Sequence, residues 1–370
     1  MTQVVIIGCG VVGAAIAYEL SLEAKFDITV IDQNSPAQGS TGAALGVLMA
    51  VISHKVKGRN WRLRAQSLAR YQTLIPELEA KTGQSIPHNT QGILSLCFDA
   101  EALPRWRSLQ TIRQDQGHAL EIWSPQQAIH RCPHLHNPGL VAGIYSPQDL
   151  QINPTALTQA LVAAAAANGV KFCFHQPVTQ LETSAAEGRC TRVHTTAQTV
   201  VADAVVVSAG LGSAALSQAL NRPLALGPVL GQGLKLHCDR PLGHPDFQPV
   251  INGNDIHLVP LGQGDYWLGA TVEFPPNTAE VEVLAMQPEA DRLQALIDGA
   301  IAYCPALAVA TIGDRWFGLR PRPQGQAAPV IQPMAGYNNV WLATGHYRNG
   351  VLLAPATALA VRDWLVGNTG

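Results

Sequence analysis

The chain has 370 residues, of which 47% are hydrophobic and 14% charged, and its formal net charge is −2 at pH 7. A chain of this length exceeds what one hydrophobic core usually serves, so we expect two domains. The small net charge argues against a general nucleic-acid binder. No stretch stays apolar over the roughly 20 residues that span a bilayer, and no basic segment precedes the first expected strand. We therefore expect a cytoplasmic protein.

The N-terminal 32 residues predict a strand, a glycine turn, a helix and a second strand. The strands are expected at residues 4–7 and 28–31, both apolar and β-branched, as in a sheet covered on both faces. A G-x-G-x-x-G motif follows the first strand, and Asp32 follows the second at the spacing typical of ribose recognition. Such a turn directs the N–H groups of the helix start at a diphosphate. We expect a dinucleotide-binding unit with the motif glycines Gly8, Gly10 and Gly13.

Residues 54–70 are locally basic, although the chain as a whole is not. A helix is expected over residues 61–83, interrupted late by Pro76. Two interpretations of the basic segment stay open. It is either a solvated helix face or a docking surface for an anionic membrane or an electron acceptor. Its basic and aromatic members are Lys55, Lys57, Arg59, Trp61, Arg62, Arg64 and Arg70.

Further along, strand-like runs alternate with helices. Residues 156–167 predict a capped helix, and residues 204–208 a very apolar strand that ends in a small-residue turn at Ala209. Residues 228–274 alternate as antiparallel strands do, and a final strand, turn and helix are expected over residues 340–366. Strand-turn-helix units thus occur at the start, middle and end of the chain, on either side of antiparallel segments.

This order predicts two discontinuous domains. One holds the dinucleotide, and the other is an antiparallel sheet that covers the reactive end of the cofactor. Such interleaving favours a flavin over a nicotinamide cofactor. The nucleotide domain is expected at residues 1–50, 150–225 and 320–370, and the substrate-binding domain at residues 51–149 and 226–319.

The cysteines and histidines predict neither a disulfide framework nor a metal site. The seven cysteines are odd in number, scattered and without C-x-x-C, so we expect buried free thiols in a reducing compartment. Three histidines of one proline-bounded loop, His130, His134 and His136, are a weak metal pattern, and we expect no metal. The cysteines are Cys9, Cys97, Cys132, Cys173, Cys190, Cys238 and Cys304.

Three separated stretches agree with one known family in sequence and spacing. They are residues 39–48 (GSTGAALGVL), 315–321 (RWFGLRP) and 341–365 (WLATGHYRNGVLLAPATALAVRDWL). With them the whole chain resembles the D-amino-acid oxidase (DAO) family of FAD-dependent oxidoreductases, nearest its bacterial glycine oxidase and D-amino acid dehydrogenase branch. The resemblance implies an α/β fold: an FAD-binding, Rossmann-like domain of the glutathione-reductase type, interleaved with an antiparallel-sheet substrate domain. It also implies non-covalent FAD, because no cysteine closely follows Arg320.

The resemblance further implies which residues hold FAD. The glycine turn holds the diphosphate, Asp32 and Gln33 the adenosine, and Val178 the adenine. Residues 345–352 bring amide donors to the pyrimidine edge of the flavin, where donors stabilise negative charge on the reduced ring. The full implied set is Gly8, Gly10, Val11, Val12, Gly13, Asp32, Gln33, Ser40, Thr41, Leu45, Gly46, Val47, Val178, Ala209, Gly210, Gly345, His346, Tyr347, Arg348, Asn349, Gly350, Val351 and Leu352.

Fewer residues are implied for the substrate. Arg320 stands where the family binds the substrate carboxylate, which a planar guanidinium matches at two points. Arg348 stands at a second position that reaches the substrate. His257 replaces a tyrosine that helps to hold the carboxylate, and Val272 replaces a methionine near the substrate. Each of the three residues also has a structural alternative. Arg320 would bridge loops, Arg348 would order the glycine turn, and His257 would be a structural histidine of its strand.

The implied activity is oxidative deamination of a small amino acid or amine: glycine, sarcosine or a D-amino acid. Hydride passes from Cα to flavin N5, the imine hydrolyses to a keto acid and ammonia, and O2 reoxidises the flavin to give H2O2. One alternative is a dehydrogenase that passes electrons to a quinone, with peripheral membrane contact through the basic segment. Alternatives of other classes are a nicotinamide dehydrogenase and a non-catalytic flavin-binding module. A homo-oligomer is expected.

Overall fold

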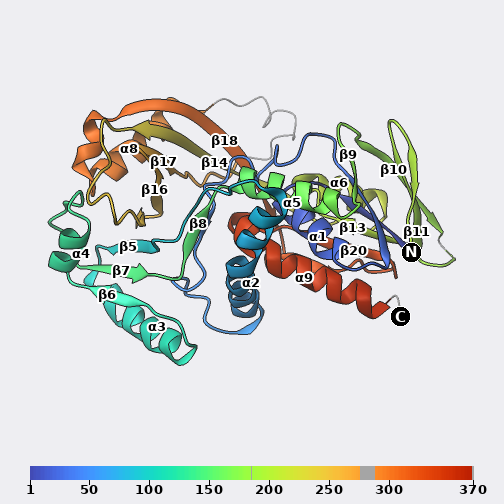
Figure 1. The fold of residues 1–370 in the computed structure, drawn as a ribbon, viewed down its shortest axis with the longest axis horizontal. Coiled ribbons are helices and arrows are strands. Elements are labelled where there is room, and N and C mark those ends of the chain that lie inside the picture. Colours follow the sequence, from blue (N-terminus) through green and yellow to red (C-terminus); the bar gives the residue numbers. More distant parts are fainter. Residues whose placement is uncertain (185, 276–287, 369–370) are drawn as a thin grey trace.

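The computed structural model describes residues 1–184, 186–275 and 288–368. Two large sheets dominate the fold and lie on opposite sides of Figure 1, with α2 and β8 between them. The sheet on the right is six-stranded, in the order β19-β20-β13-β1-β2-β9, and only β19 runs antiparallel to its neighbour. Its strands are β1 (Thr2–Ile7), β2 (Phe26–Ile31), β9 (Lys171–Cys173), β13 (Ala204–Val207), β19 (Val330–Pro333) and β20 (Val340–Thr344).

Alternate residues of the six-stranded sheet enter two different cores, because side chains of a strand point to opposite faces. Val4 and Ile6 pack with four helices, whereas Val5 and Ile7 pack with a three-stranded antiparallel sheet. This burial on both faces explains the continuous apolar strands of the sequence. The helices are α1 (Val11–Ser21), α2 (Gly58–Thr82), α5 (Pro154–Ala167) and α9 (Gly350–Asn368), and the covering strands are β10 (Val178–Ser184), β11 (Arg189–Thr195) and β12 (Thr199–Val201).

The second sheet is eight-stranded, in the order β18-β14-β17-β16-β15-β5-β7-β6, on the left of Figure 1. Its pairings are antiparallel except for that of β15 with β5. Helices α3 (Leu103–Asp115), α4 (Pro125–Arg131) and α8 (Ala290–Ile301) accompany it. Its strands are β5 (Ile93–Cys97), β6 (Glu121–Trp123), β7 (Ala142–Ser146), β14 (Leu226–His237), β15 (Val250–Gly253), β16 (Ile256–Gly262), β17 (Asp265–Gly269) and β18 (Thr311–Pro323).

A third sheet is three-stranded, in the order β3-β8-β4. It is formed by segments of the chain that connect the two large sheets. Its strands are β3 (Val47–Leu48), β4 (His88–Asn89) and β8 (Leu150–Ile152). The remaining helical turns are η1 (Ala100–Ala102), η2 (Gly210–Gly212), α6 (Ser213–Ala219), η3 (Pro305–Val309) and η4 (Tyr347–Asn349).

The loop after β3 is held by two fully buried charged side chains. Asp149 accepts hydrogen bonds from the backbone N–H groups of residues 50, 51 and 52 at 2.7, 2.9 and 2.8 Å. Arg113 donates to the carbonyl oxygens of Val51 and Ser53, both at 2.6 Å. Both side chains are completely inaccessible to solvent. A carboxylate thus satisfies the amides of this loop and a guanidinium its carbonyls, as buried polar groups require.

Two details differ from the sequence-based expectations. Helix α2 is not interrupted at Pro76 but continues to Thr82, because its apolar face stays buried on both sides of the proline, at Tyr71 and Leu78. The domain boundary expected at residue 320 falls inside β18, so Arg320 belongs to the eight-stranded sheet. The division into domains otherwise stays a prediction.

The expectation that no apolar stretch is long enough to span a bilayer is wrong, because helix α9 and its approach form one apolar segment, Tyr347–Gly367, that is long enough by length and composition. In the fold, however, α9 packs against α1 and α2, and its residues 351–354 are all buried in their shared core. Burial of this kind is typical of a central core helix.

Candidate functional site

The glycine turn after β1 brings the start of α1 very close to β13. Gly8 has a φ of +104°, and a Cβ added there would lie 2.6 Å from the carbonyl oxygen of Ser208. A Cβ on Gly13 would lie 1.9 Å from the carbonyl oxygen of Gly8. Helix α1 begins at Val11, and its N-cap residue, Gly10, has no side chain that could cap it. This glycine-lined helix start fits a diphosphate, which backbone N–H groups bind best at close approach.

Asp32 follows β2 and lies against the same turn. Its Oδ2 accepts a hydrogen bond from the backbone N–H of Cys9 at 2.6 Å, and its Oδ1 accepts one from Asn34 at 2.8 Å. A carboxylate has further acceptor capacity, so both oxygens remain able to bind ribose hydroxyls. Gln33 beside it is exposed, and Val12 packs on the helix side of the sheet.

A cavity of about 150 Å³ opens where the start of α1, residues 40–47, the eight-stranded sheet and the approach to α9 meet. Thirteen of the implied site residues line it, from segments that are far apart in the sequence. They are Val11, Ser40, Thr41, Leu45, Gly46, Val47, His257, Arg320, Tyr347, Arg348, Gly350, Val351 and Leu352. Six lining residues were missed by the sequence analysis: Ala43, Ala44, Gly231, Ala270, Gly318 and Leu319.

The remaining implied residues lie around the cavity or outside it. Val178 and Ala209 pack in the core on the β10–β12 side of the sheet, and Gly210 begins η2. Gly345 follows β20, and Asn349 accepts a hydrogen bond from Arg64 of α2 at 3.1 Å. These positions border the sheet end and the turn into α9, and their contact with FAD stays a prediction.

Ser40 and Thr41 connect the two halves of the site. The Thr41 hydroxyl oxygen accepts a hydrogen bond from the backbone N–H of Val11, at the start of α1, at 3.0 Å. The Ser40 hydroxyl donates to the carbonyl oxygen of Leu319 on β18. Two adjacent side chains therefore hold residues 43–47 between the glycine turn and the strand that carries Arg320.

Arg320 lies in the cavity with only part of its hydrogen-bonding capacity used. Its Nη1 donates to the carbonyl oxygens of Leu230 and Thr271 at 3.1 and 3.0 Å. Among the described residues no carboxylate lies within 4 Å of this guanidinium. Burial lowers the pKa of Arg320, and the nearby Arg348 lowers it further. A half-buried cation with free donors beside a second cation is a site for an anion.

Arg348 is less buried than Arg320 and has a partner. Its Nη1 lies 3.5 Å from Oδ2 of Asp255, which is 71% exposed at the turn between β15 and β16. Such a solvated pair is weak. Val272, the other departure near the substrate position, is half-buried and lies outside the cavity lining.

The comparisons with known proteins agree with this geometry. The family model for FAD-dependent oxidoreductases of the DAO type matches residues 3–364. This chain belongs to the DAO family of FAD-dependent oxidoreductases. The resemblance and the FAD prediction are thereby confirmed, and the glycine-lined approach to α1 fits that cofactor.

Three relatives of this DAO-family protein illustrate the range of the match. The glycine oxidase of Pseudomonas putida is 31% identical over 99% of this chain and 94% of its own length. A bifunctional protein ThiO/ThiG of a Synechocystis strain is 32% identical over 99% of this chain, and the chain spans 52% of that longer relative. The crystal structure of glycine oxidase from Geobacillus kaustophilus superposes with a TM-score of 0.87 at 25% identity, covering 99% of this chain and 95% of that one.

Arg320 of this DAO-family oxidoreductase rests directly on Gly231. A Cβ at position 231 would lie 2.2 Å from Nη2 of Arg320, so Gly231→Ala is expected to displace the guanidinium. We expect the KM for the substrate to rise by about 10- to 100-fold, since a misplacement of about 1 Å costs this much, while bound FAD is retained. Steady-state kinetics and the flavin spectrum test this.

The matched control is Gly227→Ala on the same strand. Its Cβ would meet only the flexible end of Gln324, at 2.5 Å, outside the cavity lining. Wild-type kinetics in G231A, or equal losses in both variants, would contradict the positioning of Arg320 by Gly231.

His346 connects pH to the stability of this oxidoreductase. It is buried, and its Nε2 lies 2.9 Å from the Thr357 hydroxyl. Burial lowers its pKa to about 3, and Arg59 contributes to the shift. Because the folded pKa lies below the unfolded value, the stabilisation is complete above about pH 6.5 and is lost as the pH falls toward the folded pKa.

We therefore expect the free energy of unfolding to fall between pH 6 and pH 4. In His346→Gln the fall should be smaller by up to about 1.4 kcal/mol per pH unit, the value for one proton. Urea unfolding at several pH values tests this, with the exposed His130→Gln as the control. The same slope in both variants would refute a role for His346.

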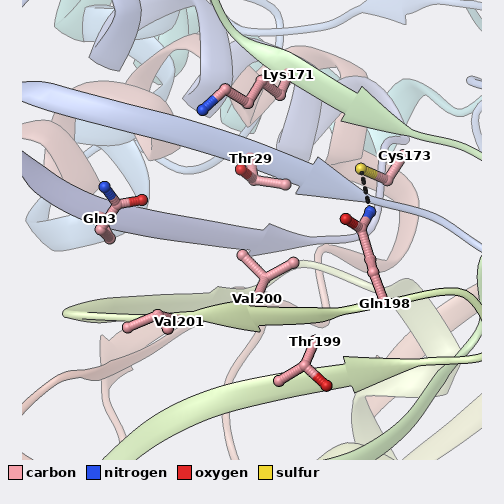
Figure 2. Close-up of a pocket in the computed structure, with 8 residues that line it drawn as sticks. All are labelled: Gln3, Thr29, Lys171, Cys173, Gln198, Thr199, Val200 and Val201. Carbon is pink, nitrogen blue, oxygen red and sulfur yellow. Dashed lines mark hydrogen bonds between the residues drawn. The ribbon is translucent and has the colours of Figure 1, made fainter.

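A second cavity, of about 490 Å³, lies between the six-stranded sheet and β12 (Figure 2). In Figure 2, Gln198 donates a hydrogen bond to the Cys173 sulfur, at 3.0 Å, across it. Gln3, Thr29 and Lys171 line the sheet side. None of the implied site residues lines this cavity.

The basic segment is only partly a solvated face. Arg59 donates to the carbonyl oxygens of Pro329 and Ile331, and Arg70 pairs with Glu19 at 2.7 Å. Arg64 is buried. Trp61 lies under the guanidinium of Arg113, with the Arg113 carbon 3.7 Å from the ring centre. The exposed cations are Lys55, Lys57, Arg59 and Arg62.

All seven cysteines are free, and all are buried except the half-buried Cys173. Within the described ranges no group of three or more histidine, cysteine, aspartate or glutamate side chains is arranged to hold a metal ion.

Proposed function

We propose that this oxidoreductase catalyses the FAD-dependent oxidative deamination of a small amino acid or amine. The observation that carries the proposal is the guanidinium of Arg320, half-buried in the cavity with free donors and without a carboxylate partner in the described part of the chain. An amino acid requires such an anchor for its carboxylate. The names of two relatives, glycine oxidases of Pseudomonas putida and Geobacillus kaustophilus, favour glycine or a similarly small amine.

The chain contributes position and exclusion of water. FAD, when bound, supplies the acceptor for the two electrons of the Cα–H bond, and the C–N bond is thereby oxidised to an imine. Arg320 holds the carboxylate and thereby orients Cα, while Arg348 adds positive charge. Val47, Val351 and Leu352 supply apolar walls that keep the reacting carbon dry. Because no acid-base step at carbon is required, the scarcity of carboxylates in the cavity lining agrees with this chemistry.

We propose oxygen as the acceptor that reoxidises the flavin, with release of hydrogen peroxide, in a cytoplasmic homo-oligomer. The second candidate is a quinone dehydrogenase that contacts the membrane. The exposed Lys55, Lys57 and Arg62 favour it, but Arg59, Arg64 and Arg70 of the same segment bind within the fold.

The test is anaerobic mixing of the FAD-loaded protein with glycine, sarcosine and both enantiomers of alanine and proline while the flavin absorbance is recorded. Bleaching by at least one amine is expected, and bleaching by none would overturn the proposal. Admitting oxygen or a soluble quinone afterwards then separates the acceptors by how fast the colour returns. Peroxide formation supports the oxidase.

A further inference from the structure

His257 belongs to a row of three polar side chains that crosses the eight-stranded sheet. In the strand register His257 of β16 faces Asn252 of β15, and Asn252 faces Ser95 of β5. Directly opposed residues of neighbouring strands present their side chains on the same face. Asn252 donates from Nδ2 to the Ser95 hydroxyl at 3.0 Å, and Ser95 is only 4% exposed.

This face of the sheet looks into the cavity. His257 itself lines the cavity. On its other side the row continues to Gly269 of β17, where a Cβ would lie 3.3 Å from Leu45, another lining residue. Gly269 has no side chain, so Asn252 is the only polar side chain opposite His257 in this row.

Two atoms of the row are buried without a partner. They are Nδ1 of His257 and Oδ1 of Asn252, and these two atoms make no hydrogen bond to each other in this structure. A buried polar atom without a hydrogen bond costs about 1–3 kcal/mol. The two atoms are complementary, because the amide oxygen only accepts and a protonated ring nitrogen donates.

Burial, together with the charges around His257, favours the neutral form of its ring. Burial and the neighbouring Arg348 lower its pKa to about 4, Arg320 adds to the effect, and Asp255 opposes it. In a neutral imidazole one nitrogen donates and the other accepts, and the bond made by one nitrogen decides the role of the other.

We propose that a rotation of the imidazole or of the amide pairs these two atoms, so that Asn252 is a positioning residue that holds the proton of His257 on Nδ1 and the bare Nε2 accepts a hydrogen bond from the amino group of the substrate. Ser95 in turn orients Asn252 through its hydrogen bond. Arg320 then binds one end of the amino acid and His257 the other. The site would therefore select carboxylates whose amine carries an N–H. This inference rests on the proposed function for the identity of the ligand, but not for the tautomer.

The first test is independent of activity. Long-range ¹H–¹⁵N spectra of histidine-labelled, FAD-loaded protein identify the tautomer of each neutral ring, and loss of signals in His257→Gln assigns His257. We expect a ring protonated on Nδ1 at pH 7. A ring protonated on Nε2, or on both nitrogens, would overturn the proposal. In Asn252→Leu, which removes the acceptor, we expect the Nδ1 preference to be lost, whereas Asn252→Asp, which keeps an oxygen at this place, retains it.

The second test measures binding. Acetate has a carboxylate but no amine, so its dissociation constant, from perturbation of the flavin spectrum, should be the same in wild type and Asn252→Leu. The apparent dissociation constant for glycine, from the concentration dependence of anaerobic flavin reduction, should rise about 10-fold, the effect of one hydrogen bond. Equal changes for both ligands would refute the amine contact. The protein could show the expected tautomer of His257 although no amine bleaches its flavin. That result would refute the proposed function but not the role of Asn252.

Discussion

Arg320→Ala is expected to lower kcat/KM for the amino acid by about 10²–10³-fold while FAD stays bound. The reason is that its charge-assisted hydrogen bonds to the carboxylate would be lost inside a partly buried site, where such bonds are strong. The two carbonyl oxygens that Arg320 now binds, of Leu230 and Thr271, would also lose a donor. Anaerobic reduction kinetics give the rate, and the visible spectrum gives the FAD content.

The control for Arg320→Ala is Arg315→Ala. Arg315 is an exposed arginine of the same strand, outside the cavity lining. Arg320→Lys separates charge from shape, since a lysine keeps the charge but not the planar fork, and we expect it to recover only a small part of the activity. Near-wild-type kinetics of R320A would show that the substrate carboxylate lies elsewhere.

Asp149→Ala is expected to lower the free energy of unfolding by about 3–5 kcal/mol. The substitution leaves three backbone N–H groups, of residues 50–52, without acceptors in a site with no solvent access, and each costs about 1–3 kcal/mol. Arg113 would in addition lose a nearby opposite charge. Urea unfolding measures the change, and a constant m-value would show that the native and unfolded states keep their compactness.

Asp149→Asn should be intermediate, because its amide oxygen still accepts while its NH2 group opposes a backbone donor. Asp115→Ala, at an exposed position, should change stability by no more than about 0.5 kcal/mol. A loss below about 1 kcal/mol in D149A would mean that the loop finds other acceptors.

Features that depend on local spacing could be predicted from the sequence. The glycine turn, the start of α1 and Asp32 lie within one continuous unit, and the structure places them as the spacing indicates. Arg320 could be found because family motifs surround it. Arg113 and Asp149 carried no such signal, since the loop whose backbone atoms they bind lies about 60 to 100 positions away.

The wall of the cavity formed by the eight-stranded sheet could not be predicted for a related reason. Asn252 and Ser95 are 157 positions apart, and only the parallel pairing of β15 with β5 brings them together. A shift of one residue in that register would turn Asn252 to the face opposite that of Ser95. Gly231 was missed because nothing in its own neighbourhood shows that an arginine of β18 lies on it.

The order of strands in the six-stranded sheet has a consequence for folding during synthesis on the ribosome. Strand β1 is made first, yet its partner β13 emerges about 200 residues later, and β20 completes the other side of β13 later still. Until β20 is made, β13 presents an open, apolar edge of the kind that pairs with other chains. We therefore expect a chain that stops before Val340 to aggregate rather than fold.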